Sequence, residues 1–394
     1  MNVCPPGLPP GAILERLRDS TQGAGLDEAQ RWIRSALTVG PVAHTPSVTT
    51  RLPFPYHWIP GPIRIRLRDW LVGRSIARLA SAPRFPELYA ENGVDVVSSR
   101  LGDRDRPRWT WPDGKRCALV LTQDVDTGSE HREIQALGEM ASALGLRSTF
   151  MFVGRHFERY RELALDLRRD RFEIGLHDVV HDNRIAFQPA GAIRARLAPW
   201  LERWRDEFDI RGFRSPSWYA SSALWDALTD LGMTHDCSVQ DTNALQEAHR
   251  TVGAATYYPY MRGPLVIIPA TVPFDELPWS LGVPREETTA FWRAKIDHVA
   301  ATGGALVVNA HPSPWFCGTE SGRRALQECL REIVDRHRPW CATASELADH
   351  VRSELARGAM RDLPGEPVVR IPRLGEAIEP GGPCANPLRP AISG

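Results

Sequence analysis

The sequence has very little lysine, few cysteines and no long apolar run. Lys115 and Lys295 are the only lysines among 48 basic residues, a bias that we attribute to coding composition rather than to an arginine-specific function. The seven cysteines are scattered without a CxxC pair, at Cys4, Cys117, Cys237, Cys317, Cys329, Cys341 and Cys384. This pattern argues against a disulfide framework or a cysteine zinc site, and it favours a reducing, cytoplasmic compartment.

Several functional classes are also disfavoured by what is missing. No apolar run is long enough to span a bilayer, so we expect no transmembrane segment. The first residues, MNVCPPGLPPGAILERLRD, lack a basic region followed by an apolar core, so we expect no secretory signal. The formal net charge is +0, so the overall charge attracts neither nucleic acid nor anionic lipid.

The composition is that of a soluble globular protein, and its patterning divides the 394 residues into three parts. We expect an N-terminal accessory or cap segment at 1–115, with two short helices in its first 50 residues. The stretch PIRIRLRDWLVGRSIARLA (62–80) is basic and partly amphipathic; a helix packed on the main domain is favoured over a peripheral membrane contact. The main domain spans 116–358, and the Pro/Gly-rich tail at 359–394 is expected to be irregular.

Short apolar runs alternate with helical segments along the main domain. The runs are CALVLT (117–122), STFMFVG (148–154), FEIGLH (172–177), GFRS (212–215), THDCSV (234–239), LVIIPA (265–270) and ALVVNAH (305–311). Strands that alternate with helices predict βαβ units and a parallel sheet. The number of runs over this length favours a (β/α) barrel over an open sheet.

Polar residues follow or end several of these runs. In parallel α/β folds, functional side chains gather at the carboxyl ends of the strands, so these residues predict one shared site. They are Asp124, Asp126, His177, Arg214, Asp236 and His311.

The sharpest pair within this set is His177 and His181, in EIGLHDVVHDNR. Two imidazoles four residues apart can face one metal ion from the same side of a helical turn. Two histidines and one carboxylate form a ligand set that leaves positions open for water and substrate.

Five ordered motifs resemble those of the polysaccharide deacetylases of the NodB-homology type, carbohydrate esterase family four, over about residues 110–350. They are LTQDVDT, HDVVH, RSPSWY (214–219), HDCSVQD (235–241) and VVNAHPSPW (307–315). The resemblance implies a distorted (β/α) barrel and a metal-dependent deacetylase that removes acetyl groups from N-acetylated sugars.

The resemblance also implies individual roles. Asp126, His177 and His181 would hold the metal, most simply Zn²⁺, although Co²⁺, Ni²⁺ or Fe²⁺ would fit. Asp124 would be the general base, with Arg214 holding its pKa down. His311 would protonate the departing amine.

Other positions carry weaker expectations. Asp236 is a candidate to orient His311, or else a structural carboxylate. Asp178 and Asp182 are either partners of the metal ligands or solvated loop residues. The proposed groove residues could contact substrate or simply pack; they are Pro216, Trp218, Tyr219 and Trp315.

Two departures from the family pattern bear on the substrate. Val125 separates two aspartates that are usually adjacent, and Asp178 stands where Ser or Thr usually follows the first histidine. On an extended strand Asp124 and Asp126 point to the same side, so base and ligand could exchange roles.

The leading hypothesis is removal of an N-acetyl group from an aminosugar-containing biosynthetic intermediate, either a small molecule or a glycan conjugate. Alternatives are a deformylase or C–N hydrolase acting on a lipid-linked or non-sugar metabolite, and a catalytically silent glycan-binding barrel. A homo-oligomer is left open.

Overall fold

The computed structural model describes residues 37–39, 48–54, 58–60, 63, 66–67, 70, 110–240, 252–254, 256–272, 275, 288–314, 316–359 and 367–370. Within these ranges no helix is long and apolar enough to cross a membrane. The helices expected before residue 37, and most of the 62–80 stretch, lie outside the described residues.

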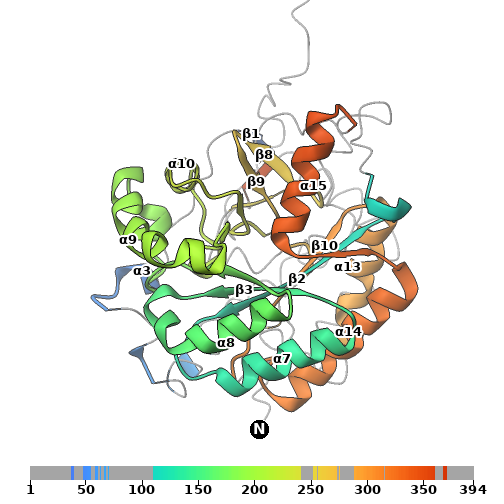
Figure 1. The fold of residues 1–394 in the computed structure, drawn as a ribbon, viewed down its shortest axis with the longest axis horizontal. Helices are drawn as coiled ribbons and strands as arrows, with labels where there is room; N and C mark the ends of the chain where they lie inside the picture. Colours follow the sequence, from blue (N-terminus) through green and yellow to red (C-terminus); the bar gives the residue numbers. More distant parts are fainter. Residues whose placement is uncertain are drawn as a thin grey trace, which may run out of the picture.

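A predominantly parallel sheet forms the centre of the molecule (Figure 1). Its strands run in the order β10-β2-β3-β4-β5-β6-β9-β8, and β11 also pairs with β2. Only the β8–β9 pair is antiparallel. The strands are β2 (Ala118–Val125), β3 (Ser148–Phe152), β4 (Glu173–Leu176), β5 (Gly212–Phe213), β6 (His235–Asp236), β8 (Tyr260–Arg262), β9 (Leu265–Ile267), β10 (Ala305–Ala310) and β11 (Trp340–Ala342).

The segment that follows β9 brings the two ends of the sheet together. The backbone N–H groups of Thr271 and Val272 both donate to the carbonyl oxygen of Val307 on β10, at 3.2 and 3.1 Å. The Thr271 hydroxyl donates to the carbonyl oxygen of Ala305 at 2.6 Å. The expected distorted (β/α) barrel is therefore confirmed.

Helices surround this sheet, and α7, α8 and α14 lie side by side along one side of it (Figure 1). The helices are α7 (His131–Ala143), α8 (Phe157–Arg169), α9 (Ala190–Phe208), α10 (Ser222–Asp230), α13 (Thr288–Thr302), α14 (Glu320–His337) and α15 (Ala344–Ala356).

Strand β2 is apolar on both of its faces, which explains the unbroken apolar run in the sequence. Leu119 and Leu121 belong to the core between the sheet and the helices, whereas Ala118 and Val120 belong to the core inside the barrel. Successive side chains of a strand point to opposite faces. Asp124 is therefore on the inner face of the barrel, at the end of the strand.

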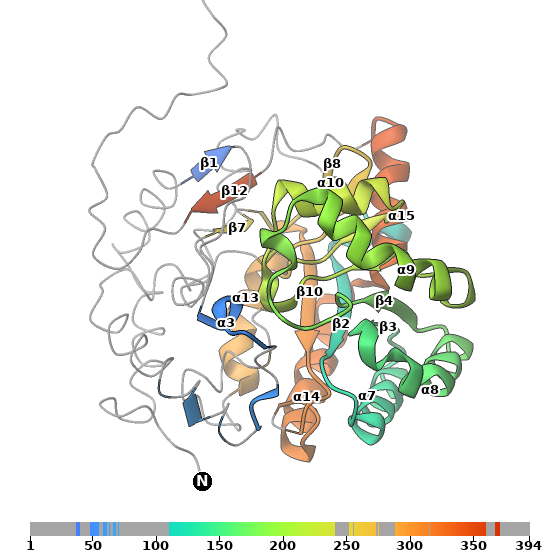
Figure 2. The same ribbon diagram turned by 90° about the vertical axis from the view of Figure 1, so that its left-hand side faces the viewer.

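A second, three-stranded antiparallel sheet lies apart from the barrel strands (Figure 2). It contains β1 (Leu37–Val39), β12 (Pro367–Arg370) and β7 (Val252–Ala254). The tail was expected to be irregular, and this expectation is wrong at Pro367–Arg370. Local composition does not reveal pairing between segments more than 300 residues apart. The domain boundaries at 115 and 358 stay predictions.

Glu173 lies at the amino end of β4, at the opposite end of the strand from His177. Its carboxylate accepts hydrogen bonds from Thr149 Oγ1 (2.9 Å) and from the backbone N–H and hydroxyl of Ser345 at the start of α15 (2.9 and 2.8 Å). Burial alone would raise the pKa of Glu173, but His235 and Ser345 outweigh it and lower the pKa to about 2.

The pH dependence of stability should reveal this carboxylate. Because its pKa is lowered on folding, its contribution is present above the ordinary value of 4.5 and is lost as the pH falls toward 2. We expect Glu173→Gln to lower the free energy of unfolding by about 1–3 kcal/mol at pH 7 and by less at pH 3. Denaturant unfolding across this range checks it, with Glu158→Gln, an exposed partner of Arg203, as control. If Glu173→Gln lost as much free energy of unfolding at pH 3 as at pH 7, the proposed role of this carboxylate would be wrong.

Candidate metal centre

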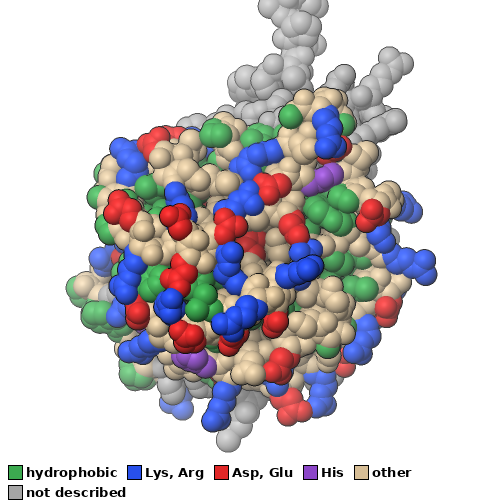
Figure 3. Space-filling model, in the orientation of Figure 1, with side chains coloured by type: hydrophobic (Ala, Val, Ile, Leu, Met, Phe, Trp, Pro, Cys, Tyr) green, Lys and Arg blue, Asp and Glu red, His purple; other side chains and the backbone are tan. Residues whose placement is uncertain are grey.

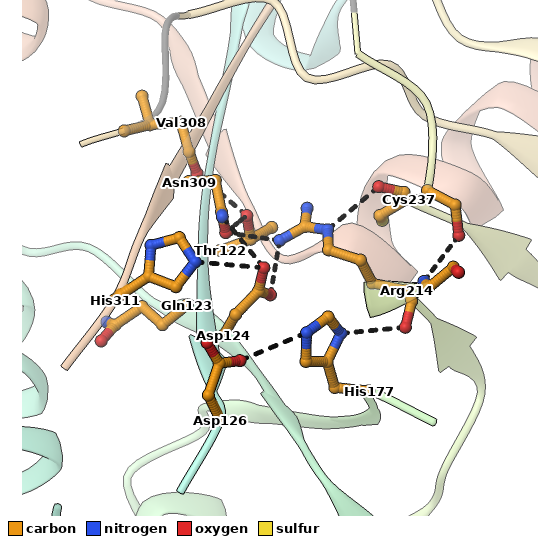
Figure 4. A network of polar contacts seen from close by, with 12 residues as sticks. Thr122, Gln123, Asp124, Asp126, His177, Arg214, Cys237, Val308, Asn309 and His311 are labelled. Carbon is orange, nitrogen blue, oxygen red and sulfur yellow. Dashed lines mark hydrogen bonds and ion pairs between the residues drawn. The ribbon is translucent and has the colours of Figure 1, made fainter. Parts of the chain in front are cut away.

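Asp126, His177 and His181 converge just beyond the carboxyl ends of β2 and β4. Asp126 Oδ1 lies 3.3 Å from the Nε2 atom of each histidine. The three side chains each offer one ligand atom, and all three atoms lie within 4.8 Å of one another. Figure 4 shows His177 and Asp126 facing each other across this space.

The hydrogen bonding of His177 indicates that a cation fits between these groups. Its Nδ1–H donates to the carbonyl oxygen of Arg214 at 2.9 Å, so in a neutral ring Nε2 carries a lone pair. That lone pair faces Asp126 Oδ1, a buried atom that no well-formed hydrogen bond reaches. With the His177 ring neutral, two acceptors face each other here, an arrangement that a metal ion would satisfy.

The spacing also fits the size of a small divalent ion. Ligand atoms about 2.0–2.1 Å from a tetrahedral zinc ion lie roughly 3.3 Å apart. The pKa of Asp126 is well below its ordinary value, because His181 and His177 together outweigh the effect of burial. A carboxylate that is ionised at neutral pH is the form that binds a metal.

Asp124 is the centre of a buried polar network beside these three candidate ligands (Figure 4). Its Oδ1 accepts a hydrogen bond from Arg214 Nη1 (2.8 Å), and its Oδ2 accepts one from Asn309 Nδ2 (3.0 Å). Burial raises the pKa of Asp124, but Arg214, His177 and His311 outweigh it and leave the pKa below its ordinary value. The expected pairing of Arg214 with Asp124 is present.

His311 follows β10 and places Nε2 3.8 Å from Asp124 Oδ2. Its Nδ1 lies 2.7 Å from Asp275 Oδ1, and its backbone N–H donates to Asp275 Oδ2 at 2.8 Å. Asp275 therefore fixes both the backbone and the ring of His311.

Asp236 does not orient His311, so that expectation is wrong. Its carboxylate accepts hydrogen bonds from Trp225 Nε1 of α10 (2.7 Å) and from Ser238 Oγ (2.5 Å). The physical reason is direction: the side chain of Asp236 faces α10. Asp275 follows the apolar run at 265–270, and a carboxylate after a strand was the available signal for it.

Three of the proposed groove residues are buried against protein. The centroid of the Trp218 ring lies 4.4 Å from the Arg214 guanidinium carbon. Tyr219 contacts Phe187, with 4.9 Å between their ring centroids. Pro216 is buried at the start of the same short turn. These contacts favour the packing role for Trp218. Trp315 lies outside the described residues.

Arg196 of α9 spans the loop between the two histidines. Its guanidinium donates to Asp178 at 2.8 and 2.5 Å, to the Val180 carbonyl oxygen at 2.6 Å and to Asp182 at 3.0 Å. Asp178 is fully buried and has a φ of 57°, a left-handed conformation that aspartate tolerates better than most residues. Asp178 and Asp182 are thus partners of one arginine, not solvated residues.

Removing this arginine should loosen the metal site. We expect Arg196→Met to weaken metal binding by about 10–100-fold, since partners that orient ligands have effects of this size. It should also lower the free energy of unfolding by about 3–5 kcal/mol, because Asp178 would be left as an unpaired buried charge. Metal competition titration and denaturant unfolding measure the two effects. Arg194→Met is the matched control, since Arg194 of the same helix pairs with the exposed Asp230; equal effects in both variants would refute the role.

The fold is shared with two solved structures assigned as polysaccharide deacetylases. One from Mycobacterium smegmatis is 22% identical, has a TM-score of 0.52, and the match covers 63% of this chain and 94% of that one. Another, from Pseudomonas aeruginosa PAO1, is 13% identical with a TM-score of 0.54, covering 64% of this chain and 97% of that one. No protein-family model matches the sequence, and no curated protein matches it. The chain therefore has the polysaccharide-deacetylase fold over about two thirds of its length.

Proposed function

We propose that this chain is a metal-dependent amide hydrolase that removes an N-acetyl group from an aminosugar-containing intermediate. The observation that carries the proposal is the placing of Asp124 and His311 beside the group formed by Asp126, His177 and His181. A base and an acid next to a set of metal ligands is the arrangement used in metal-assisted amide hydrolysis. The shared fold supports the same reaction class.

Asp126, His177 and His181 would hold the ion, with zinc as the first choice. When bound, such an ion lowers the pKa of water from 15.7 toward about 7 and polarises a carbonyl group. Asp124 would accept the proton of the attacking water. Arg214 and Asn309 hold its two oxygens in place, so that the carboxylate stays ionised and fixed.

The departing amine needs a proton, because an amide anion is a poor leaving group. His311 would supply it from Nε2, since Asp275 holds Nδ1 through a hydrogen bond of 2.7 Å. A backbone N–H near Tyr219 would help to stabilise the oxyanion of the tetrahedral intermediate.

Asp275 gives a test of this acid. Asp275→Asn is expected to lower kcat by about 10–100-fold with little change in metal content, because the ring of His311 would lose its fixed tautomer and orientation. Steady-state kinetics across pH, with metal analysis, check the expectation. Asp236→Asn is the control, because Asp236 is another buried carboxylate of the same barrel. If kcat fell in Asp236→Asn but not in Asp275→Asn, Asp275 would not be the residue that orients His311.

The proposed residues could act on several classes of substrate. The proposed substrate is an aminosugar linked to a nucleotide, a metabolite or a lipid. Removal of a formyl group from a lipid-linked aminosugar, or hydrolysis of a C–N bond in a non-sugar metabolite, would use the same residues. A silent glycan-binding barrel is disfavoured, because the residues proposed as base and ligands lie together.

The deciding experiment measures acetate and formate released from a panel of aminosugar conjugates. The protein is assayed as purified, after treatment with a chelator, and after zinc is restored. The proposal predicts acetate release that chelation abolishes and zinc restores. Tight sugar binding without release of acetate or formate from any substrate would support the silent glycan-binding barrel instead.

A further inference from the structure

The exposed large apolar side chains are concentrated in one stretch of the chain. Among the residues that the structure describes, six such side chains are exposed, and five of them lie between residues 54 and 70. They are Phe54, Trp58, Ile63, Leu67 and Trp70, and the sixth is Phe187. Trp58 and Ile63 are each 58% exposed. Scattered single residues would need no explanation, but a cluster marks an interaction surface.

Part of this cluster has the spacing of one helical face. Ile63, Arg66, Leu67 and Trp70 are in helical conformation. Ile63, Leu67 and Trp70 stand at positions i, i+4 and i+7, a spacing that predicts one apolar strip on the same side of a helix. Arg66 is exposed and falls at the border of this strip.

The same stretch is strongly basic. Residues 51–80 contain six arginines and a single acid, Asp69, in a chain whose basic and acidic residues number 48 each. Elsewhere the two signs are mixed: the face shown in Figure 3 has Lys and Arg side chains interspersed with Asp and Glu. The local charge therefore differs from the neutral whole.

Hydrogen bonds connect residues 49–52, at the start of this stretch, to the residues that directly follow the loop carrying His177 and His181. Asn183 Nδ2 donates to Thr49 Oγ1 (3.0 Å), and Arg184 Nε donates to the carbonyl oxygen of Thr50 (3.0 Å). Thr49 and Thr50 belong to α3 (Val48–Arg51), and Arg184 also donates to the Leu52 carbonyl oxygen. Asn183 and Arg184 come directly after the HDVVHD sequence. The residues directly before Phe54 are thus anchored to the loop that carries His177 and His181.

A further contact lies on the other side of the same loop. The Arg155 guanidinium lies 5.5 Å from the centroid of the Trp58 ring. The backbone N–H of Arg155 donates to Val179, between the two histidines, at 2.9 Å. Trp58 is therefore held near the ligands while more than half of its surface remains exposed.

We propose that the exposed side chains of Phe54, Trp58, Ile63, Leu67 and Trp70 form a membrane-docking surface that binds anionic lipid and brings the metal centre to the bilayer. Apolar side chains on one helical face, bordered by arginines, are the features of helices that lie in the interface of anionic bilayers. Tryptophan is favoured at that depth, and arginine keeps its charge in water while its stem covers apolar surface. This proposal deepens the proposed function: it selects an aminosugar attached to a membrane lipid as the substrate.

Vesicle binding tests the surface without requiring any activity. The full chain is sedimented with vesicles of phosphatidylcholine alone and with vesicles containing phosphatidylglycerol. We expect at least tenfold stronger binding to the anionic vesicles, weakened by salt. Ile63→Ser with Leu67→Ser should reduce that binding at least tenfold. Arg66→Glu should do the same, whereas Arg331→Glu, on an exposed position of α14, should not.

Three results would overturn the proposal. The first is that the wild type binds neutral and anionic vesicles equally, or binds neither. The second is unchanged binding by the serine variant. The third is a concentration-dependent dimer that the serine variant loses, which would assign the surface to a second copy of the chain. Hydrolysis of a soluble aminosugar amide is measured in parallel, so that failure of the chemistry is distinguished from failure of docking.

Discussion

Asp124→Asn is expected to abolish turnover and leave the metal in place. The variant keeps the size of the side chain, and Asp124 is outside the group formed by Asp126, His177 and His181. An amide cannot take the proton from water, so kcat should fall by about 10²–10⁴-fold, the usual contribution of a general base. Kinetics and metal analysis of the same preparation measure both properties.

The matched control is Asp226→Asn, which changes an exposed carboxylate paired with Arg262. It should have wild-type kinetics and metal content. Loss of the metal in Asp124→Asn would show that Asp124 is a ligand, and the roles of Asp124 and Asp126 would then be exchanged.

Asp126→Asn and His177→Ala are expected to lose metal and activity together. Each removes one of the three proposed ligand atoms, and a two-ligand site binds zinc far more weakly than a three-ligand site. We expect metal affinity to fall by at least about 100-fold, beyond the 10–100-fold typical of residues that only orient ligands. Competition titration with a chromophoric chelator measures it.

His337→Ala is the control for loss of an imidazole. His337 Nε2 lies at hydrogen-bond distance, 2.8 Å, from Asp297 Oδ1 of α13. It is not part of the group formed by Asp126, His177 and His181. Full metal affinity in His177→Ala would place the ion elsewhere.

The local part of the site could be predicted from the sequence. The apolar run 117–122 predicted β2, and the two-residue period of a strand placed Asp124 and Asp126 on one side. Val125, the residue between them, packs into the core between sheet and helices, which agrees with that alternation. Because β2 and β4 are neighbours through β3, the carboxyl ends of these strands bring Asp126 close to His177.

Contacts between distant segments could not be predicted. Arg196 lies on an amphipathic helix among other arginines, and nothing in its neighbourhood distinguishes it from Arg194. Asp236 and Asp275 are equally plausible partners of His311 in sequence, and only the direction of each side chain separates them. Asn309 was also missed, although a polar residue inside the apolar run ALVVNAH was a usable signal.

The most direct test of the metal centre is anomalous X-ray diffraction at the zinc edge from crystals of the zinc-loaded protein. We predict one strong peak about 2.0–2.2 Å from Asp126 Oδ1, His177 Nε2 and His181 Nε2. A peak bonded to other residues, or zinc-loaded active protein with no peak between these three atoms, would contradict it.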